Sequence, residues 1–328
     1  MSSERKKLVE VQDLTVQFGS RRHPFTAVDK VSFHIYQGET LGLVGESGSG
    51  KTTIGRAIIR IHPTAGGKVI FDGKQINGRI SRDLDREVTR RIQMIFQDPM
   101  ASLNERAKVD YIVSEGLYSN GSRLTREERQ EKVAQTLSDV GLLPEFASRF
   151  PHEFSGGQRQ RIGIARAIIM EPDFIIADEP ISALDVSIQA QIINLLQDLQ
   201  KEFGLTYMFV THDMSVVRHI SHNISVMYLG QVVETSPAKE LFEKTLHPYS
   251  KALLSAIPSI DIDKPKKRIQ LRGELVSPID PKPGCRFAPR CPYATEACKQ
   301  PQKLEEVLPN HFVACCRARE LNTELEGA

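Results

Sequence analysis

Tryptophan is missing from the 328 residues, cysteine is missing before Cys285, and neither sign of charge is in clear excess. Lys and Arg together number 43 against 41 Asp and Glu, which gives a formal net charge of +2 at pH 7. That balance argues against a dedicated nucleic-acid-binding protein, which usually presents a strongly basic face. The content of 40% hydrophobic and 26% charged residues is that of an ordinary globular protein, long enough for one large domain or two.

Long hydrophobic runs are missing as well. The longest stretch without a charged residue, residues 219–233, is 15 residues long and contains two His, one Asn and one Gln. A membrane-spanning helix needs about 20 mostly apolar residues. The basic N-terminal residues reach Glu10 and Asp13 before the apolar segment of a signal peptide could form. We therefore expect a cytoplasmic protein that reaches a membrane only through a partner.

Strand-like and helix-like segments alternate through residues 1–255, which is typical of α/β architecture. Between residues 98 and 166 polar loops alternate with helical periodicity, so we expect a helical subdomain inserted into the α/β core. Beyond it, residues 256–328 form a proline-rich linker and a small module that contains the cysteines. The predicted strands are 8–18, 31–36, 40–44, 174–177 and 206–210, with a polar turn at 20–24. The predicted helices are 53–61, 125–137 (opened by a capping box), 187–203 and 215–220.

A glycine-rich loop follows the strand at 40–44 and opens the next helix. Its sequence, Gly-Glu-Ser-Gly-Ser-Gly-Lys-Thr, matches G-x-x-x-x-G-K-[ST]. The glycines let backbone N–H groups approach phosphate, Lys51 would reach the β- and γ-phosphates, and Thr52 would offer its hydroxyl to Mg²⁺. The nucleotide-binding residues expected here are Gly45, Ser47, Gly48, Gly50, Lys51, Thr52 and Thr53.

Two acidic residues end the apolar strand at 174–177. Asp178 would reach the magnesium site beside Thr52, and Glu179 could polarise an attacking water as general base. Paired acids after a strand are common, so this pattern predicts a catalytic site only in combination with the phosphate-binding loop upstream.

Three further segments follow a fixed order along the chain. The sequence Phe-Ser-Gly-Gly-Gln at 154–158 opens a helix and is a second anion-binding helix start. Gln97 ends a strand at the border of the helical subdomain, and His212 ends the strand after the acidic pair.

In this combination and order the motifs resemble the nucleotide-binding domains of ABC transporters, over about residues 8–255. The segment at 154–158 is similar to the family signature, and Asp185 in Ser-Ala-Leu-Asp matches the D-loop. The resemblance implies an α/β P-loop NTPase core of the ABC type, a mixed sheet flanked by helices, that binds and hydrolyses ATP with Mg²⁺. In this family two domains dimerise head to tail, and each ATP lies between the P-loop of one and the signature of the other.

The resemblance also implies roles for single residues. Glu179 would be the general base, His212 would hold the γ-phosphate, and Gln97 would sense γ-phosphate and Mg²⁺. Phe18 would stack on adenine, with Phe25 as a poorer alternative and an ordinary core position also open. The expected magnesium ligands are Thr52, Gln97 and Asp178, and the residues expected to act at the partner's nucleotide are Ser155, Gly156, Gly157, Gln158 and Asp185.

Several longer stretches, among them MIFQDPMASLN and LHPYSKALLSAIP, resemble the oligopeptide/dipeptide permease subfamily, most closely its F-type ATP-binding subunit. That resemblance implies a peripheral subunit on the cytoplasmic face of the cell membrane. Its partners would be two transmembrane permease subunits, a second ATPase as heterodimer partner, and an extracellular or periplasmic substrate-binding protein, with no nucleic acid. An importer of nickel or another small substrate is the alternative, and a soluble ABC ATPase outside transport is a remote one.

Five cysteines lie in the last part of the chain without the tight C-x2-C spacing of zinc modules. Four thiolates on such loops could instead hold a [4Fe–4S] cluster, and tails of this subfamily are associated with such clusters. Zinc and unligated thiols are the alternatives. The candidate ligands are Cys285, Cys291, Cys298 and either Cys315 or Cys316. Since the tail has little apolar content, we expect a metal or the parent domain to hold it in place.

Overall fold

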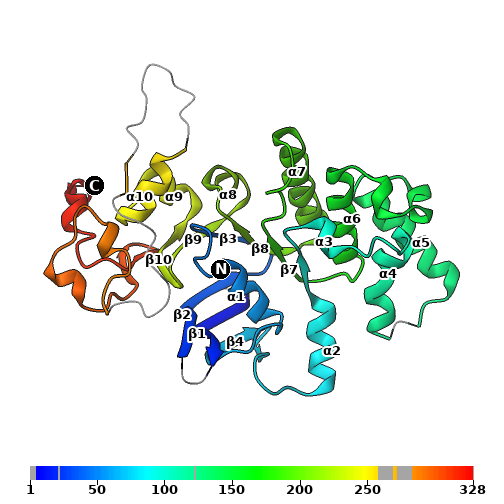
Figure 1. Ribbon diagram of the computed structural model, residues 1–328, viewed down its shortest axis with the longest axis horizontal. Helices are drawn as coiled ribbons and strands as arrows, with labels where there is room; N and C mark the ends of the chain where they lie inside the picture. Colours follow the sequence, from blue (N-terminus) through cyan, green and yellow to red (C-terminus); the bar gives the residue numbers. More distant parts are fainter. Residues whose placement is uncertain (1–4, 21–22, 122, 258–268, 272–282, 328) are drawn as a thin grey trace.

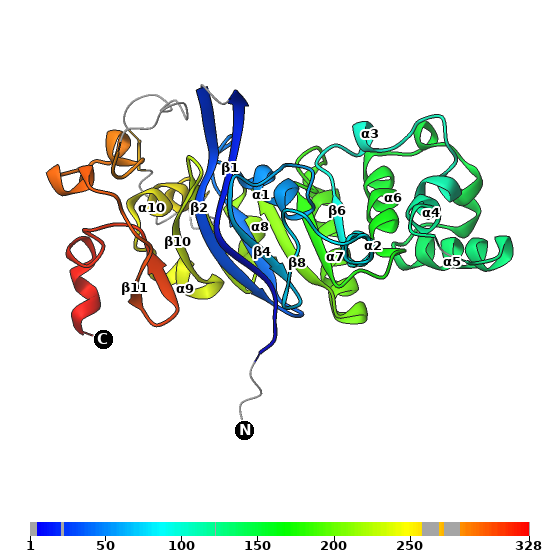
Figure 2. The same cartoon turned by 90° about the horizontal axis from the view of Figure 1, so that it is seen from below.

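The computed structural model describes residues 5–20, 23–121, 123–257, 269–271 and 283–327. Within these ranges the chain forms an eight-stranded and a four-stranded sheet with helices packed against them. Figures 1 and 2 show the sheets in the middle, the helices of residues 99–168 at one end, and the C-terminal segment at the opposite end. Most of the predicted linker, 258–268 and 272–282, lies outside the described residues.

The eight-stranded sheet has the spatial order β11-β12-β10-β9-β3-β8-β7-β6. From β9 to β6 neighbouring strands are parallel and mostly buried, as expected of a sheet covered on both faces. The loops after these strands therefore emerge at one edge, where α/β proteins bind ligands. The bounds are β3 (Thr40–Val44), β6 (Ile92–Ile95), β7 (Phe174–Asp178), β8 (Thr206–Thr211), β9 (Asn223–Tyr228), β10 (Gln231–Pro237), β11 (Glu305–Leu308) and β12 (His311–Val313).

The four-stranded sheet is antiparallel, in the order β2-β1-β4-β5. Its strands are β1 (Lys7–Ser20), β2 (His23–Tyr36), β4 (Gly66–Phe71) and β5 (Lys74–Gln75). The predicted strand 8–18 is confirmed, but the prediction of a strand only from residue 31 was wrong. β2 already begins at His23, because its first half pairs with β1 in a long hairpin, with Phe25 opposite Phe18.

The helices cover both faces of the larger sheet and form the group at one end. Predicted helices 187–203 and 215–220 are confirmed to within one residue, whereas the helix predicted at 53–61 begins and ends earlier. The capping box at Thr125 and Glu128 is also confirmed. The bounds are α1 (Lys51–Ile58), α2 (Arg82–Arg91), α3 (Pro99–Ser102), α4 (Val109–Ser119), α5 (Arg126–Asp139), α6 (Gly156–Ile168), α7 (Val186–Phe203), α8 (Met214–Ile220), α9 (Ala238–Glu243) and α10 (Pro248–Ser255). Short 3-10 turns are η1 (Pro144–Ser148), η2 (Pro151–Glu153), η3 (Ala288–Arg290), η4 (Glu296–Lys299) and η5 (Glu320–Gly327).

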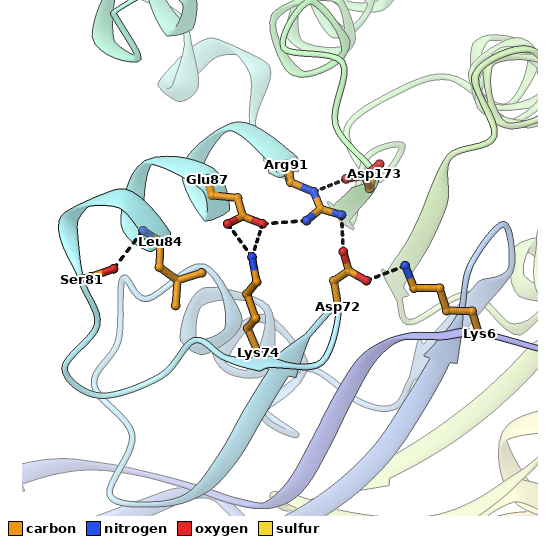
Figure 3. Close-up of polar contacts among 8 residues, drawn as sticks. All are labelled: Lys6, Asp72, Lys74, Ser81, Leu84, Glu87, Arg91 and Asp173. Carbon is orange, nitrogen blue, oxygen red and sulfur yellow. Dashed lines mark hydrogen bonds and ion pairs between the residues drawn. The ribbon is translucent and has the colours of Figure 1, made fainter.

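Arg91, the last residue of α2, joins that helix to both sheets (Figure 3). Its guanidinium donates to Asp173 before β7, to Asp72 after β4 at 2.8 Å, and to Glu87 one turn earlier at 2.8 Å. Lys6 of the N-terminal segment pairs with Asp72 at 2.5 Å. Hydrogen bonds from Lys6 and Arg91 lower the pKa of Asp72, which keeps the carboxylate charged. The network sets the position of α2 relative to both sheets.

The C-terminal segment is attached to the edge of the larger sheet. β12 pairs with β10, so that the hairpin of β11 and β12 continues the sheet. The fully buried carboxylate of Glu234 in β10 accepts hydrogen bonds from the backbone N–H groups of Leu246 (2.7 Å) and His247 (3.1 Å). It also contacts Nε2 of His311 in β12 at 2.8 Å. We expected either a metal or the parent domain to hold the tail in place. These contacts are made by the parent domain.

An aromatic cluster provides a second attachment. Phe287 is 1% exposed and lies among the rings of Tyr228, Tyr249 and His247, with centroid distances of 5.2, 5.4 and 5.8 Å. Tyr228 ends β9 and the other two lie at the start of α10. One side chain of the tail therefore completes a small core between sheet and helix.

Candidate nucleotide-binding and hydrolysis site

The loop between β3 and α1 has the form of a phosphate cradle. Gly45 and Gly50 adopt φ values of 156° and 101°. A Cβ on Gly45 would lie 2.2 Å from the carbonyl oxygen of Met227, and one on Gly50 would lie 2.6 Å from that of Ala27. Both positions therefore require glycine, which is the physical reason for the motif.

Lys51 begins α1 and is 4% exposed. Its ammonium donates hydrogen bonds to the carbonyl oxygens of Gly45 at 2.8 Å and Glu46 at 2.9 Å. Burial lowers the pKa of Lys51, and the carboxylates of Glu179, Asp178 and Glu46 oppose that shift. The ammonium thus lies inside the loop, held only by oxygen atoms that it can exchange for phosphate oxygens.

A hydroxyl and a carboxylate meet beside this loop. Thr52 donates from Oγ1 to Oδ1 of Asp178 at 2.8 Å. Asp178, the last residue of β7, is 1% exposed, and this burial raises its pKa against the hydrogen bond from Thr52. These are the oxygen ligands that Mg²⁺ takes in phosphoryl-transfer sites, so the pair fits the predicted ion. Gln97, the third predicted ligand, contacts Glu179.

Glu179 lies between the two other predicted catalytic residues. The amide of Gln97 donates to its Oε2 at 3.1 Å, and Nδ1 of His212 lies 3.4 Å from its Oε1. The backbone of Glu179 adopts the left-handed region with φ of 45°, which is uncommon for a residue with a side chain and recurs at functional sites. Since β6, β7 and β8 are adjacent and parallel, the residues that follow their carboxyl ends meet at one edge of the sheet.

These residues surround a cavity of about 770 Å³. Most of the predicted nucleotide and catalytic residues line it: Phe18, Gly45, Ser47, Gly48, Gly50, Lys51, Thr52, Thr53, Gln97, Glu179 and His212. Three lining residues were missed by the sequence analysis, namely Ala27, Glu46 and Leu253. Glu46 stands inside the motif at a variable position, and Leu253 reaches the cavity from α10, so no local pattern indicates either.

Both aromatic candidates for the adenine site lie at this cavity. Phe18 and Phe25 are directly paired across the hairpin of β1 and β2 and line the same cavity. Phe18 also packs edge-on against His62, with ring centroids 5.0 Å apart. The choice of Phe18 over Phe25 stays a prediction.

The predicted signature residues lie elsewhere. Ser155 caps α6 and forms a capping box with Gln158, and neither belongs to the lining of the cavity. Ser155, Gly156 and Asp185 are exposed, and a Cβ on Gly157 would lie 2.7 Å from Cγ2 of Ile188. The start of α6 therefore lies outside the cavity that the subunit's own P-loop lines.

All five cysteines lie in the tail, and none of them forms a disulfide. Across the described ranges, no group of three or more His, Cys, Asp or Glu is placed to hold a metal ion, so the iron–sulfur and zinc hypotheses gain no support from the geometry. Cys285 and Cys315 are partly buried, and burial raises the pKa of each to about 11.

Comparison with known proteins assigns the family. Residues 28–182 match the model of the ABC transporter family, and residues 233–298 match the oligopeptide/dipeptide transporter C-terminal region. The oligopeptide transport ATP-binding protein AmiF of Streptococcus pneumoniae serotype 4 is 60% identical over 80% of this chain and 86% of its own. The chain belongs to the ATP-binding proteins of ABC transporters. As a member of that family it is an ATPase.

Two further relatives extend the match to nearly the whole chain. OppF of Streptococcus pyogenes serotype M1 is 52% identical over 94% of this chain and 95% of its own. AppF of Bacillus subtilis strain 168 is 49% identical over 96% and 98%. Both are described as oligopeptide transport ATP-binding proteins. The matched C-terminal region, residues 233–298, includes Cys285, Cys291 and Cys298.

Solved structures agree with the α/β cassette fold. The cbiO1 protein of Clostridium perfringens superposes with a TM-score of 0.64 at 29% identity, over 73% of this chain and 91% of its own. The ATP-binding cassette MJ0796, solved as a dimer bound to ADP and Pi, gives the same TM-score and identity over 70% of this chain and 98% of its own. In the described part of this ABC ATPase, no helix is long and apolar enough to cross a membrane.

Proposed function

We propose that this ABC ATPase hydrolyses ATP on the cytoplasmic face of the cell membrane to energise the uptake of oligopeptides. The observation that carries the proposal is the contact of Gln97 and His212 with Glu179, next to the buried pair of Thr52 and Asp178. The oligopeptide assignment is supported by relatives at 49 to 60% identity and by the matched C-terminal region.

Hydrolysis would proceed by in-line attack of water on the γ-phosphorus. Glu179 would accept the proton of that water, while Gln97 and His212 hold the carboxylate in place from either side. Lys51 would move from the carbonyl oxygens of the loop to the β- and γ-phosphate oxygens. Mg²⁺, when bound by Thr52 and Asp178, supplies charge neutralisation on the phosphate oxygens. Catalysis then depends on positioning and charge, with no covalent intermediate.

The exposed start of α6 supports a dimeric site. Ser155, Gly156, Gly157, Gln158 and Asp185 lie outside the cavity of their own subunit, so a second ATPase domain would have to bring its nucleotide to them. A helix N-terminus suits a phosphate. We expect a heterodimer with a related ATPase.

A second cavity, of about 600 Å³, would be the docking site for a permease subunit. It lies between α2 and the helices α4 and α6, and its lining includes Phe96, next to Gln97. Arg60, Asp85, Glu115 and Arg166 add charges of both signs. The network of Figure 3 fixes α2, so one wall of the groove is rigid. A cytoplasmic helix of one transmembrane subunit would dock here and sense the site through Gln97.

Detergent extraction and affinity purification of the chain from its native host tests the function. We expect two membrane subunits and a second ATPase to copurify, and peptides presented by the binding protein to stimulate ATP hydrolysis. The same complex carrying Glu179→Gln is the matched control for background activity. Stimulation by nickel or another small solute and not by peptides would favour the alternative importer. Recovery with nucleic acid and without membrane subunits would contradict transport.

The iron–sulfur hypothesis for the tail cysteines stays a prediction. Anaerobically purified wild-type chain should contain about four iron atoms and show a brown chromophore, and Cys291→Ser should lose both while retaining ATP binding. Elemental analysis distinguishes the possibilities: zinc in place of iron would favour the zinc site, and neither metal would leave five free thiols.

A further inference from the structure

Glu46, the second residue of the P-loop, is held at three points by three different parts of the chain. Its N–H donates to the hydroxyl oxygen of Tyr249 in α10 at 3.0 Å. Its carbonyl oxygen accepts from Lys51 at 2.9 Å, and its carboxylate accepts from Nη1 of Arg290 at 2.8 Å. The side chain at a variable motif position therefore lines the nucleotide cavity and is paired with a residue of the C-terminal tail.

Arg290 is built into the tail as a buried cation. Its side chain is 10% exposed and lies over the ring of Tyr228, with Nη1 3.4 Å from the hydroxyl of that residue. It follows Phe287 by one 3-10 turn, and Phe287 packs on Tyr249, the residue that holds the N–H of Glu46. The tail thus reaches the P-loop by an ion pair and by ring packing.

The charge of Glu46 matters because phosphates would bind next to it. Its carboxylate already interacts with the ammonium of Lys51, and it lines the nucleotide cavity together with that lysine. Without a cation beside it, the carboxylate would repel the triphosphate and compete for Lys51. Arg290 supplies that cation, with its Nη1 2.8 Å from Oε2 of Glu46.

We propose that Arg290 is a positioning residue for ATP binding, which neutralises Glu46 and orients the P-loop from the C-terminal tail. The inference rests on ATP binding by this P-loop and adds a residue that lies more than 200 positions away in sequence. It gives the tail a part in the ATPase reaction that does not depend on whether its cysteines hold a metal.

A mutant cycle on the purified full-length chain tests the proposal, with the Kd for Mg-ATP measured by calorimetry. Arg290→Met keeps an unbranched apolar side chain at this position and removes the charge, so it should raise Kd about tenfold. The double variant Arg290→Met/Glu46→Gln removes both charges and should restore Kd to within about threefold of wild type. Raising NaCl from about 0.05 to 0.5 M should shrink the effect of the single variant, because salt screens the repulsion.

Arg286→Met is the matched control. Arg286 also joins the tail to the core, through Asp29 and the carbonyl oxygen of Leu229, but it does not contact the P-loop. The Kd of the Arg286→Met variant for Mg-ATP should stay near the wild-type value. If Arg290→Met does not fold, Arg290→Gln takes its place in the cycle.

The outcomes separate positioning from mere attachment of the tail. An unchanged Kd for Arg290→Met would overturn the proposal, and so would a double variant as weak as the single one, because lost attachment is not repaired by Glu46→Gln. If Lys51→Met binds Mg-ATP as tightly as the wild type does, the assignment of the P-loop fails instead of the role of Arg290.

Discussion

Glu179→Gln should lower kcat for ATP hydrolysis about a thousandfold while the Kd for Mg-ATP stays within about threefold of wild type. A positioned general base contributes about 10²- to 10⁴-fold, and an amide cannot accept the proton of the attacking water. Gln has the same shape, so it can keep the contacts to Gln97 and His212, which lie 3.1 and 3.4 Å away. Phosphate release under saturating Mg-ATP measures kcat, and calorimetry measures binding.

The control for this variant is Glu202→Gln, which makes the same chemical change at an exposed position near the end of α7. It should hydrolyse ATP at the wild-type rate. A Glu179→Gln variant that turned over as fast as Glu202→Gln would show that another group takes the proton.

Lys51→Met should weaken Mg-ATP binding by about a hundredfold or more. The ammonium is the cation closest to the expected phosphates, and its charge-assisted hydrogen bonds are about twice as strong as neutral ones. Thermal unfolding should change little, because Met fills the same space and removes a buried charge that costs free energy to desolvate. Calorimetry with Mg-ATP gives the affinity, and circular dichroism gives the melting temperature.

Lys201→Met on the exposed face of α7 is the matched control, since its lysine pairs only loosely with Asp198 at 3.9 Å. It should bind Mg-ATP as the wild type does. Equal affinities for the two variants would mean that the P-loop cation is not used, and the site would have to be sought elsewhere on the subunit.

The nucleotide site could be predicted largely from sequence because each of its parts is local. The cradle needs glycines at Gly45 and Gly50, and their left-handed backbone and close neighbours show why no other residue fits. Glu179, Gln97 and His212 follow the carboxyl ends of adjacent parallel strands, and an apolar strand that ends in a polar residue is visible in a single sequence.

Pairings between segments that are distant in the sequence could not be predicted. The part of β2 before residue 31 contains Pro24, Asp29 and Lys30, which are poor strand formers, and pairing with β1 overrides that preference. β9, which is buried along nearly its whole length, and β10, which lacks regular alternation, were also missed. The contacts of Glu46 with Tyr249 and Arg290 depend on where α10 and the tail dock, and no spacing encodes those positions.

The hairpin of β11 and β12 also prevents the protein from self-associating through a sheet edge. An unpaired sheet edge is a template for further strands, and β10 would present such an edge if β12 did not pair with it at Glu234 and Thr235. At the opposite end the edge strand β6 has only four residues, flanked by α2. A shortened protein that ends after α10 would expose the long side of β10 together with Tyr228 and Tyr249, and it would tend to self-associate during expression. Work on the isolated ATPase therefore needs the tail for solubility as well as for function.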